Sequence, residues 1–243
     1  MRGSLRRVLG VAALSSKWIL RQPTWMIQDV LIIASLFIIL TAWGGREAAM
    51  NLVAAWIVVG AWGVGVNGVG QEVGWSRIAR YYYMYVASPL KPLEYLAGIV
   101  LGNMPLVAVD ASVLVAASTL LLGDPSIVLY GLAGGFMLLP VAVFTGLSIV
   151  LRLRRPTNIS AVTNPVTFIL TLLPPVFYPL SILPPVLRPA ALLVPTVAAA
   201  ELARSLAGLS VASYPPIVPF TVLAAWLVAS GLAAGRVVRW GLE

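Results

Sequence analysis

Two long apolar stretches, Leu52–Gly70 and Leu96–Leu122, hold a single ionisable residue, Asp110, and each is long enough to cross a bilayer as a helix. The segment between them, residues 71–94, carries five charged side chains. A charged segment that connects two apolar helices has to lie in water at one face of the membrane. We therefore expect an integral membrane protein of the all-α class, in which residues 71–94 form a cytosolic loop.

The composition agrees with a chain whose main solvent is lipid. Of its 243 residues 60% are hydrophobic and 10% charged, and the mean hydropathy is +0.97, which leaves too much apolar surface for a soluble domain. At about 20 residues per span plus loops, there is room for about six helices in a single domain, residues 1–243. The chain has no cysteine and no histidine, which excludes disulfides, thiolate or imidazole metal sites and histidine acid–base catalysis.

Six apolar segments predict six transmembrane helices. They are Thr24–Trp43, Asn51–Gly70, Tyr95–Leu122, Ser126–Val150, Asn158–Tyr178 and Ile217–Gly235. In the fifth segment, Pro165, Pro174 and Pro175 are expected to bend or break the helix. Glycines four residues apart, such as Gly98 and Gly102, predict close helix packing, because small residues let helices approach each other in lipid.

The N-terminal segment, residues 1–23, predicts an elbow helix that lies in the membrane interface. Its five cations fall within roughly 140° of a helical wheel, and Leu5, Val8, Ala12 and Ile19 lie on the other side. Pro23 is expected to end this helix before the first span. A signal peptide is the alternative, because a charged start is followed by a short apolar run.

The distribution of cations predicts the orientation of the spans. With six spans, thirteen of the sixteen Lys and Arg residues fall on the side of both termini. They are Arg2, Arg6, Arg7, Lys17, Arg21, Arg77, Arg80, Lys91, Arg152, Arg154, Arg155, Arg236 and Arg239. Because Lys and Arg concentrate in cytoplasmic loops, we expect a multi-pass protein of the cell membrane with both termini in the cytoplasm. This distribution also accounts for the net charge of +8 without nucleic acid as a partner.

An apolar, proline-rich segment, residues 179–216, separates the fifth and sixth predicted spans on the outer side. Prolines at first-turn positions predict two short helices, Pro185–Leu193 and Pro195–Ala207. We expect a re-entrant helical hairpin that dips into the outer leaflet. Glu201 and Arg204 are three residues apart on the second helix, which predicts an ion pair that faces water.

Asp110 lies near the middle of the third predicted span. An acid at that depth is costly and by default indicates a functional site. The structural alternative is that Asp110 faces the bundle interior or an outer vestibule and accepts hydrogen bonds from Ser or Asn side chains.

The cytosolic loop predicts a helix over residues 72–87 that contacts a soluble partner. Val73, Ile78, Tyr82 and Tyr85 could fill a groove of that partner, and Arg77 and Arg80 could pair with its acids. The alternative is an interfacial helix whose tyrosines lie among lipid headgroups.

An internal energy source for transport is missing from the sequence. No phosphate-binding P-loop occurs, because neither lysine, Lys17 or Lys91, follows a glycine. The spans contain no paired carboxylates, no nucleophile motif and no carbonyl filter of the channel type. Any energy for transport therefore has to come from a partner.

Three groups of residues occur in a fixed order along the chain. The basic helix ends in Arg21–Asp29, RQPTWMIQD; Glu72 and Gly74 precede Ser88-Pro89-Leu90; and Phe177-Tyr178-Pro179, Leu183-Pro184 and Pro195-Thr196 follow toward the C-terminus. In this order they resemble the elbow helix, coupling loop and re-entrant hairpin of the permease subunits of type-2 ABC transporters. Val73 stands where this family often has a basic residue, and Tyr178-Pro179 where a Ser-Gly pair is common.

The resemblance implies half of an ATP-driven exporter for an amphiphilic drug, a lipid or a glycan-type substrate. Two copies, or this chain and a sister chain, would join two ABC ATPase subunits that bind ATP and magnesium, with no cofactor on this chain. The residues implied for coupling to the ATPase are Glu72, Gly74, Arg77, Ile78 and Arg80. The second and fifth spans would line the path, and Phe177, Tyr178 and Leu183, with Asp110, would form the outer gate or the path.

Two other functions stay open at this point. One is a secondary carrier or channel that works alone through Asp110. The other is a membrane scaffold or enzyme that transports nothing.

Overall fold

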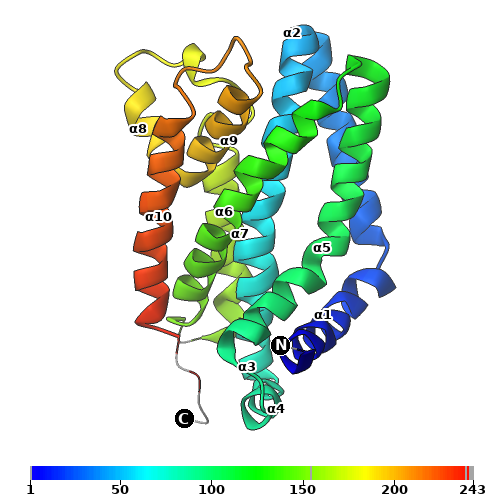
Figure 1. Cartoon of the computed structure of the whole chain (residues 1–243), viewed down its shortest axis with the longest axis vertical. Helices are drawn as coiled ribbons and strands as arrows, with labels where there is room; N and C mark the ends of the chain where they lie inside the picture. The colour runs from blue at the N-terminus through cyan, green and yellow to red at the C-terminus, as the bar shows by residue number, and fades with distance from the viewer. Residues whose placement is uncertain (1, 154, 239, 241–243) are drawn as a thin grey trace.

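The computed structural model describes residues 2–153, 155–238 and 240, and in this part of the chain every regular element is a helix. Figure 1 shows an elongated bundle with α3 and α4 at one end, here called the α4 end, and α8 and α9 at the other, the α8 end. α1 lies at the α4 end, where α10 also finishes. Two cations of the sequence count, Arg154 and Arg239, lie outside the described residues.

The elements follow one another along the chain as helices with short connections. They are α1 (Arg2–Arg21), α2 (Thr24–Gly63), the π-helix η1 (Val64–Gly70), α3 (Gln71–Ile78), α4 (Tyr82–Ala87), α5 (Pro92–Ala117), the π-helix η2 (Ser118–Leu122), α6 (Ser126–Val150), the short 3₁₀ turn η3 (Pro156–Asn158), α7 (Ile159–Thr171), the 3₁₀ turn η4 (Leu180–Ile182), α8 (Arg188–Leu192), α9 (Pro195–Leu206) and α10 (Ile217–Gly235).

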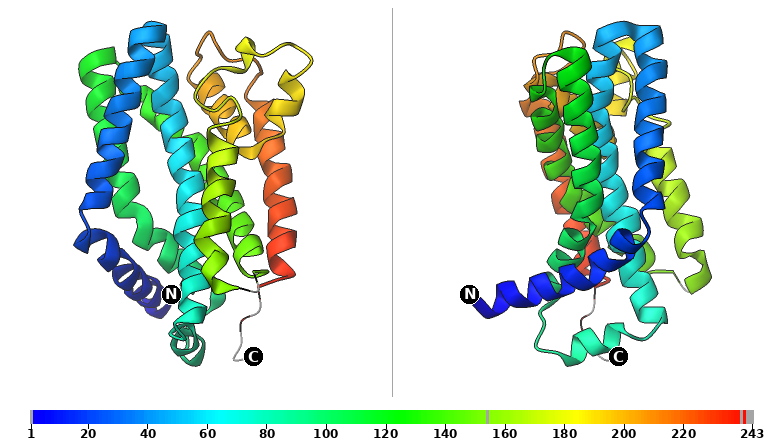
Figure 2. Two further views of the ribbon diagram at one scale, coloured as in Figure 1. Left: turned by 180° about the vertical axis from the view of Figure 1, so that it is seen from behind. Right: turned by 90° about the vertical axis from the view of Figure 1, so that its right-hand side faces the viewer.

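α2 consists of two limbs that run in opposite directions. Gly45 interrupts its helical backbone with φ 62° and ψ −153°, a conformation that glycine adopts without steric cost. Figure 2 shows the chain rising along the first limb, turning at the α8 end and returning along the second limb into η1 and α3. The two limbs correspond to the first and second predicted spans.

Four helical stretches of the described chain are long and apolar enough to cross a membrane: Thr24–Ile78, Pro92–Leu122, Ser126–Val150 and Ile217–Gly235. The first contains both limbs of α2. The bounds of the last two are those predicted from the sequence.

α7 is shorter than the predicted fifth span. The helix ends at Thr171, seven residues before Tyr178, and turns and extended backbone follow. Its 13 residues rise about 20 Å, which is less than the roughly 30 Å of a bilayer core. The physical reason lies in Pro174 and Pro175, which have no N–H group with which to continue the helix.

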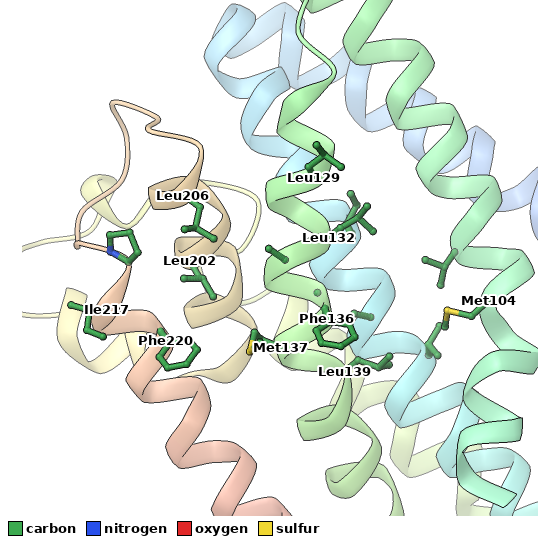
Figure 3. Close-up of a pocket in the computed structure, with 17 residues that line it drawn as sticks. Met104, Leu129, Leu132, Phe136, Met137, Leu139, Leu202, Leu206, Ile217 and Phe220 are labelled. Carbon is green, nitrogen blue, oxygen red and sulfur yellow. The ribbon is translucent and has the colours of Figure 1, made fainter. Parts of the chain in front are cut away.

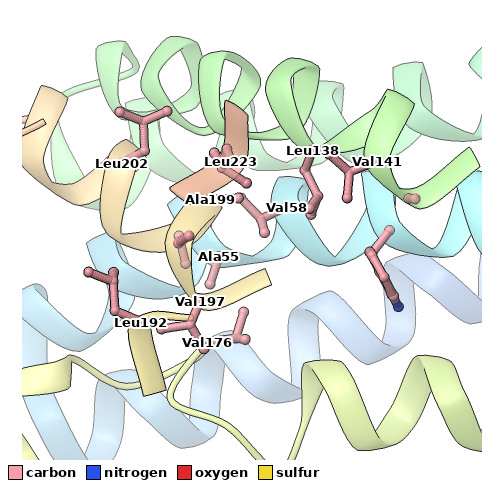
Figure 4. Packing of buried hydrophobic residues seen from close by; sticks show 14 of the residues in the cluster. Ala55, Val58, Leu138, Val141, Val176, Leu192, Val197, Ala199, Leu202 and Leu223 are labelled. Carbon is pink, nitrogen blue, oxygen red and sulfur yellow. The ribbon is translucent and has the colours of Figure 1, made fainter. Parts of the chain in front are cut away.

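α6 is the central helix, packed against α2, η1, α9 and α10. One apolar cluster joins α6, the second limb of α2, α9 and α10 with Val176 of the outer segment, residues 172–183, and Figure 4 shows Ala55, Val58 and Leu138 among its members. A second cluster lies between the limbs of α2 near the α8 end, and a third lies at the α4 end around Val73, Tyr82 and Tyr95. The outer segment and α9 are therefore packed against the bundle by buried apolar side chains.

α1 runs across the bundle axis and packs on α5 (Figure 2). An added Cβ at Gly98 would lie 2.5 Å from the Cβ of Val11, and one at Gly102 would lie 2.4 Å from the Cβ of Ser15. This glycine pair therefore serves the contact of α5 with α1. Arg6, Lys17 and Arg21 of α1 are exposed, whereas Val11, Ser15 and Ile19 are buried.

Candidate functional site

The α3–α4 corner, residues 71–87, projects at the α4 end of the bundle (Figure 1). The sequence predicted one helix over residues 72–87, and this prediction is wrong, because the helix breaks between Ile78 and Tyr82. Arg80 stands in the break with φ 62°, the only non-glycine in the described chain with left-handed backbone. α3 continues the second limb of α2 through η1, so any force on the corner acts directly on that limb.

Glu72 faces α1 of its own chain. Its carboxylate accepts a 2.6 Å hydrogen bond from the Ser15 hydroxyl of α1. Glu72 also acts on the tyrosines of the corner: burial raises the pKa of Tyr81 and Tyr85, and the negative charge of Glu72 raises both further. Glu72 therefore connects α1 to α3 within the subunit.

Gly74 lies where α3 meets the end of α6 and the start of α7. A Cβ at this position would be 2.5 Å from Cγ1 of Val150 and 2.7 Å from Cδ1 of Ile159. The residue allows a close contact that no larger side chain fits. Its observed role is packing inside the subunit.

Arg77 is half-buried beneath the corner. Its guanidinium carbon lies 4.7 Å from the centre of the Tyr82 ring, a cation–π contact, and Nη2 donates to the Tyr82 hydroxyl at 3.4 Å. The ring of Trp240 packs against Tyr82 and Tyr95 at 5.6 and 5.5 Å. Val73 and Tyr82 were predicted to fill a partner's groove, which is wrong because both are buried against their own chain.

The exposed part of the corner is a mixed apolar and basic surface. Its large exposed residues are Trp75, Ile78, Arg80, Tyr81, Tyr83 and Met84. Two of the residues predicted for coupling, Ile78 and Arg80, belong to this surface, while Glu72, Gly74 and Arg77 lie behind it.

A second contact fixes α1 at the start of α5. Arg7 and Glu94 form a two-bond ion pair, with Nε to Oε2 at 2.8 Å and Nη2 to Oε1 at 2.6 Å, and the bonds to Glu94 raise the pKa of the Arg7 guanidinium. The Ser4 hydroxyl and the backbone N–H of Lys91 also donate to Glu94. α1 is thus bonded to α3, the first helix of the corner, through Glu72, and to α5, the helix that follows the corner, through Glu94.

The outer segment, residues 172–183, carries three of the predicted gate residues. The Phe177 ring lies 6.2 Å from the ring of Trp56, and the Asn51 amide donates to the Phe177 carbonyl. The Tyr178 hydroxyl donates to the Leu173 carbonyl at 3.5 Å. The carbonyl of Leu183 accepts a 2.9 Å bond from Arg188. The segment is thus tied to the second limb of α2 and to α8.

Glu201 and Arg204 do form an ion pair, at 3.4 Å, but the prediction that it faces water is wrong. Both side chains are completely buried. Arg204 finds acceptors on α2 and on the outer segment, and Glu201 accepts backbone N–H groups of Ser213 and Tyr214. Burial is possible because charged groups in an apolar interior need several hydrogen bonds, which these partners supply.

Asp110 faces the interior of the bundle, and its partner is a tryptophan. The Trp56 indole donates to Oδ2 at 3.2 Å, while Oδ1 has no hydrogen-bond partner among the described residues. Trp56 therefore lies between Asp110 and Phe177. The predicted Ser or Asn partner is replaced by a residue that also contacts the outer segment.

Sequence reasoning missed a polar seam that joins η1 and α3 to α7. The Gln71 amide donates to Thr163 at 2.8 Å and to Asn164 at 3.1 Å, and accepts from Ser160. Asn67, in the π-helix η1, accepts from Thr167 at 3.3 Å. The sequence carries a pattern for this seam, because the amide residues Asn67 and Gln71 are four apart and the hydroxyl residues Thr163 and Thr167 are four apart. The π-helix η1 is a second indication, since π-helical turns often occur at functional sites.

An apolar cavity of ≈ 760 Å³ opens on the face of α6 between α5 and α9/α10. Figure 3 shows Met104, Phe136, Leu202 and Phe220 on its walls. All its lining residues are apolar, so the cavity suits hydrocarbon chains.

These elements define a multi-pass helical membrane protein whose corner at one end is continuous with a central helix. The sequence profile of the ABC-2 type transporter family matches residues 15–207. The chain belongs to this family and is a permease subunit of a type-2 ABC transporter. No curated protein sequence matches the chain.

The family is one of transport permeases and implies association with an ABC ATPase subunit. The match covers α2 through α9 in full. The family match therefore favours a transport permease over a scaffold or an enzyme.

Proposed function

We propose that the chain forms half of the translocation path of an ATP-driven exporter, assembled with a second permease and two ABC ATPase subunits. The second permease is another copy or a sister chain. ATP and magnesium bind to the ATPase subunits, and this chain binds no cofactor. The observation that carries the proposal is the exposed α3–α4 corner, because it continues into the limb that reaches the outer segment.

We place the α4 end in the cytoplasm of a cell membrane. Support comes from the described cations, which gather around α1, the corner and the α6–α7 connection, while only Arg46, Arg188 and Arg204 lie toward the α8 end. In this arrangement the chain crosses the membrane six times: through the two limbs of α2, then α5, α6, α7 together with the outer segment, and α10. α1 then lies in the inner interface as an elbow helix, and residues 179–216 form a re-entrant segment in the outer leaflet.

The path is proposed to run along the face that α7 exposes. Near the α4 end this face offers the Asn164 amide, and farther along it offers Phe168, Ile169 and Leu172. A surface with one polar and one apolar part fits an amphiphile, which is consistent with a drug, a lipid or a glycan-linked lipid as the substrate. Membrane lipids are the proposed occupants of the apolar cavity on α6.

Coupling is proposed to pass from the corner to the outer segment as a movement of one continuous limb. The ATPase would contact the exposed surface of Ile78, Arg80 and Met84. Glu72, Gly74 and Arg77 would act behind it by keeping α1, α6 and α4 attached to α3. The limb then carries the movement to Trp56 and Asn51, which touch Phe177.

The experiment is purification of the tagged chain in nanodiscs from its own cells, with mass spectrometry of co-purifying proteins and an ATP hydrolysis assay. We expect a near-stoichiometric P-loop ATPase. Met84→Glu should abolish its binding, because this side chain is 73% exposed at the corner. Val186→Glu, at a side chain 86% exposed near the α8 end, is the matched control and should keep the ATPase. Purification of a folded chain without any ATPase would refute the proposal.

A further inference from the structure

One buried cation holds the backbone of the outer segment. Arg204 of α9 has no exposed surface, and its Nη2 donates to the carbonyls of Val176 and, at 3.3 Å, of Tyr178. Its Nε donates to Oδ1 of Asn51 on the second limb of α2. Most of its acceptors therefore lie outside α9, on two elements that are far apart in the sequence.

Asn51 and Glu201 complete the arrangement. The Asn51 amide nitrogen donates to the Phe177 carbonyl, so Arg204 and Asn51 together occupy three consecutive carbonyls, residues 176–178. Glu201 pairs with Arg204 at 3.4 Å and accepts the N–H groups of Ser213 and Tyr214 in the connection to α10. The same buried group thus binds the outer segment, the second limb and the start of the last helix.

The outer segment depends on these bonds because its backbone is not helical. Residues 172–179 form turns and extended backbone, and Pro179 disfavours helical backbone at Tyr178, so no helix satisfies the carbonyls of residues 176–178. The guanidinium in turn cannot lose its acceptors while it stays buried, because an unpaired charge in an apolar interior is strongly unfavourable. The segment and the cation therefore hold each other in one arrangement.

We propose that Asn51, Glu201 and Arg204 form a clamp that keeps residues 176–178 in the closed position, and that the outer gate opens only when the bonds of Arg204 to these carbonyls break. The inference rests on the proposed function, in which residues 176–178 belong to the outer gate. The three residues position the gate and have no contact with substrate in this arrangement. Because Asn51 lies on the limb that continues to the α3–α4 corner, movement of that limb would release the clamp.

The test uses the absence of cysteine from the sequence. A single Val176→Cys, at a side chain with no exposed surface, reports release of the segment through its rate of reaction with a water-soluble maleimide. The full chain is labelled in nanodiscs without nucleotide. We expect Arg204→Met to speed the reaction at least about tenfold, the factor for one lost hydrogen bond to a charged group, and Arg204→Lys to give a smaller rise because an ammonium cannot span the same acceptors.

Two controls separate release of the clamp from unfolding. Ala200→Cys, buried on α9 itself, should stay unreactive in the Arg204→Met background. Arg46→Met removes an arginine that caps the Leu122 carbonyl at the same end and should leave Val176→Cys slow. The double variant Glu201→Gln/Arg204→Met, which leaves no buried charge, should release the segment in the same way if Arg204→Met alone fails to fold.

An unchanged rate at Val176→Cys in a folded Arg204 variant would overturn the clamp, and so would an equal rise at both cysteines. Neither measurement involves the ATPase. Failure of the chain to bind an ATPase would refute the proposed function and leave the labelling result as it stands.

Discussion

The Ser15 hydroxyl of α1 donates a 2.6 Å hydrogen bond to the Glu72 carboxylate of α3, so the acid expected to face a partner binds the subunit's own N-terminal helix. Ser15 is buried, and its Cβ packs over Gly102 of α5. The Ser15 side chain therefore contacts both α3, the first helix of the corner, and α5, the helix that follows the corner. In the proposed transporter, α1 would follow the corner when the ATPase moves it.

We predict that Ser15 and Glu72 are energetically coupled. Ser15→Ala and Glu72→Ala should each destabilise the subunit, and a double-mutant cycle should show an interaction of about 0.5–1.5 kcal/mol in thermal unfolding in nanodiscs. Ser16→Ala is the control, because the neighbouring Ser16 bonds only to a carbonyl within α1. Strict additivity of the Ser15 and Glu72 variants would contradict this contact.

Gly74→Ala should destabilise the subunit by about 1–3 kcal/mol, because its methyl group would overlap the stiff side chain of Val150. Gly63→Ala, in the same limb, places its methyl where no atom lies within 4 Å and should have no such effect. The measurement is the midpoint of thermal unfolding of both variants. Equal midpoints would show that Gly74 is not a packing residue.

Removing the ion pair at the start of α5 should loosen α1. In Arg7→Ala, Glu94 keeps only its bonds to Ser4 and to the backbone of Lys91, so amide hydrogen exchange over residues 4–20 should become faster. Arg6→Ala removes an exposed cation of the same helix and is the matched control. Unchanged exchange in Arg7→Ala would mean that packing on Gly98 and Gly102 alone holds α1.

Asp110→Asn distinguishes ATP-driven transport from ion-driven transport. An asparagine oxygen can still accept the Trp56 bond, so the contact with the second limb survives. We expect ATP-dependent uptake of a fluorescent lipid analogue by inside-out vesicles to persist in this variant and in the presence of a protonophore. Loss of uptake under both conditions would favour a carrier that uses Asp110.

The sequence alone predicts the long helices well. α6 and α10 begin and end where the apolar runs do, because a proline precedes the first residue of each helix and charged residues follow the last turn. Pro195 likewise marks the start of α9. The fifth span was expected to bend or break at Pro165, Pro174 and Pro175; α7 runs through Pro165 and ends before the other two. The break at Arg80 was not predicted. A proline in a membrane helix can either bend the helix or end it. No local sequence pattern predicts left-handed backbone at an arginine.

The sequence indicated only part of the proposed gate and clamp. The resemblance indicated Phe177, Tyr178 and Leu183, but Glu201 and Arg204 read as a surface pair, since a charged i, i+3 spacing is the same on an exposed and on a buried helix. Their burial depends on Asn51 and on carbonyls of residues 176–178, which lie far away in the sequence. Contacts of this kind form only in the folded bundle, so no local sequence pattern predicts them.

The measurement that tests the account most directly is the reactivity of Val176→Cys in the assembled transporter with and without ATP and magnesium, read as the mass of this chain. The account predicts that ATP speeds the reaction and that Met84→Glu at the α3–α4 corner abolishes this response. A complex that hydrolyses ATP while Val176→Cys reacts equally slowly in both conditions would contradict the claim that the corner drives the outer gate.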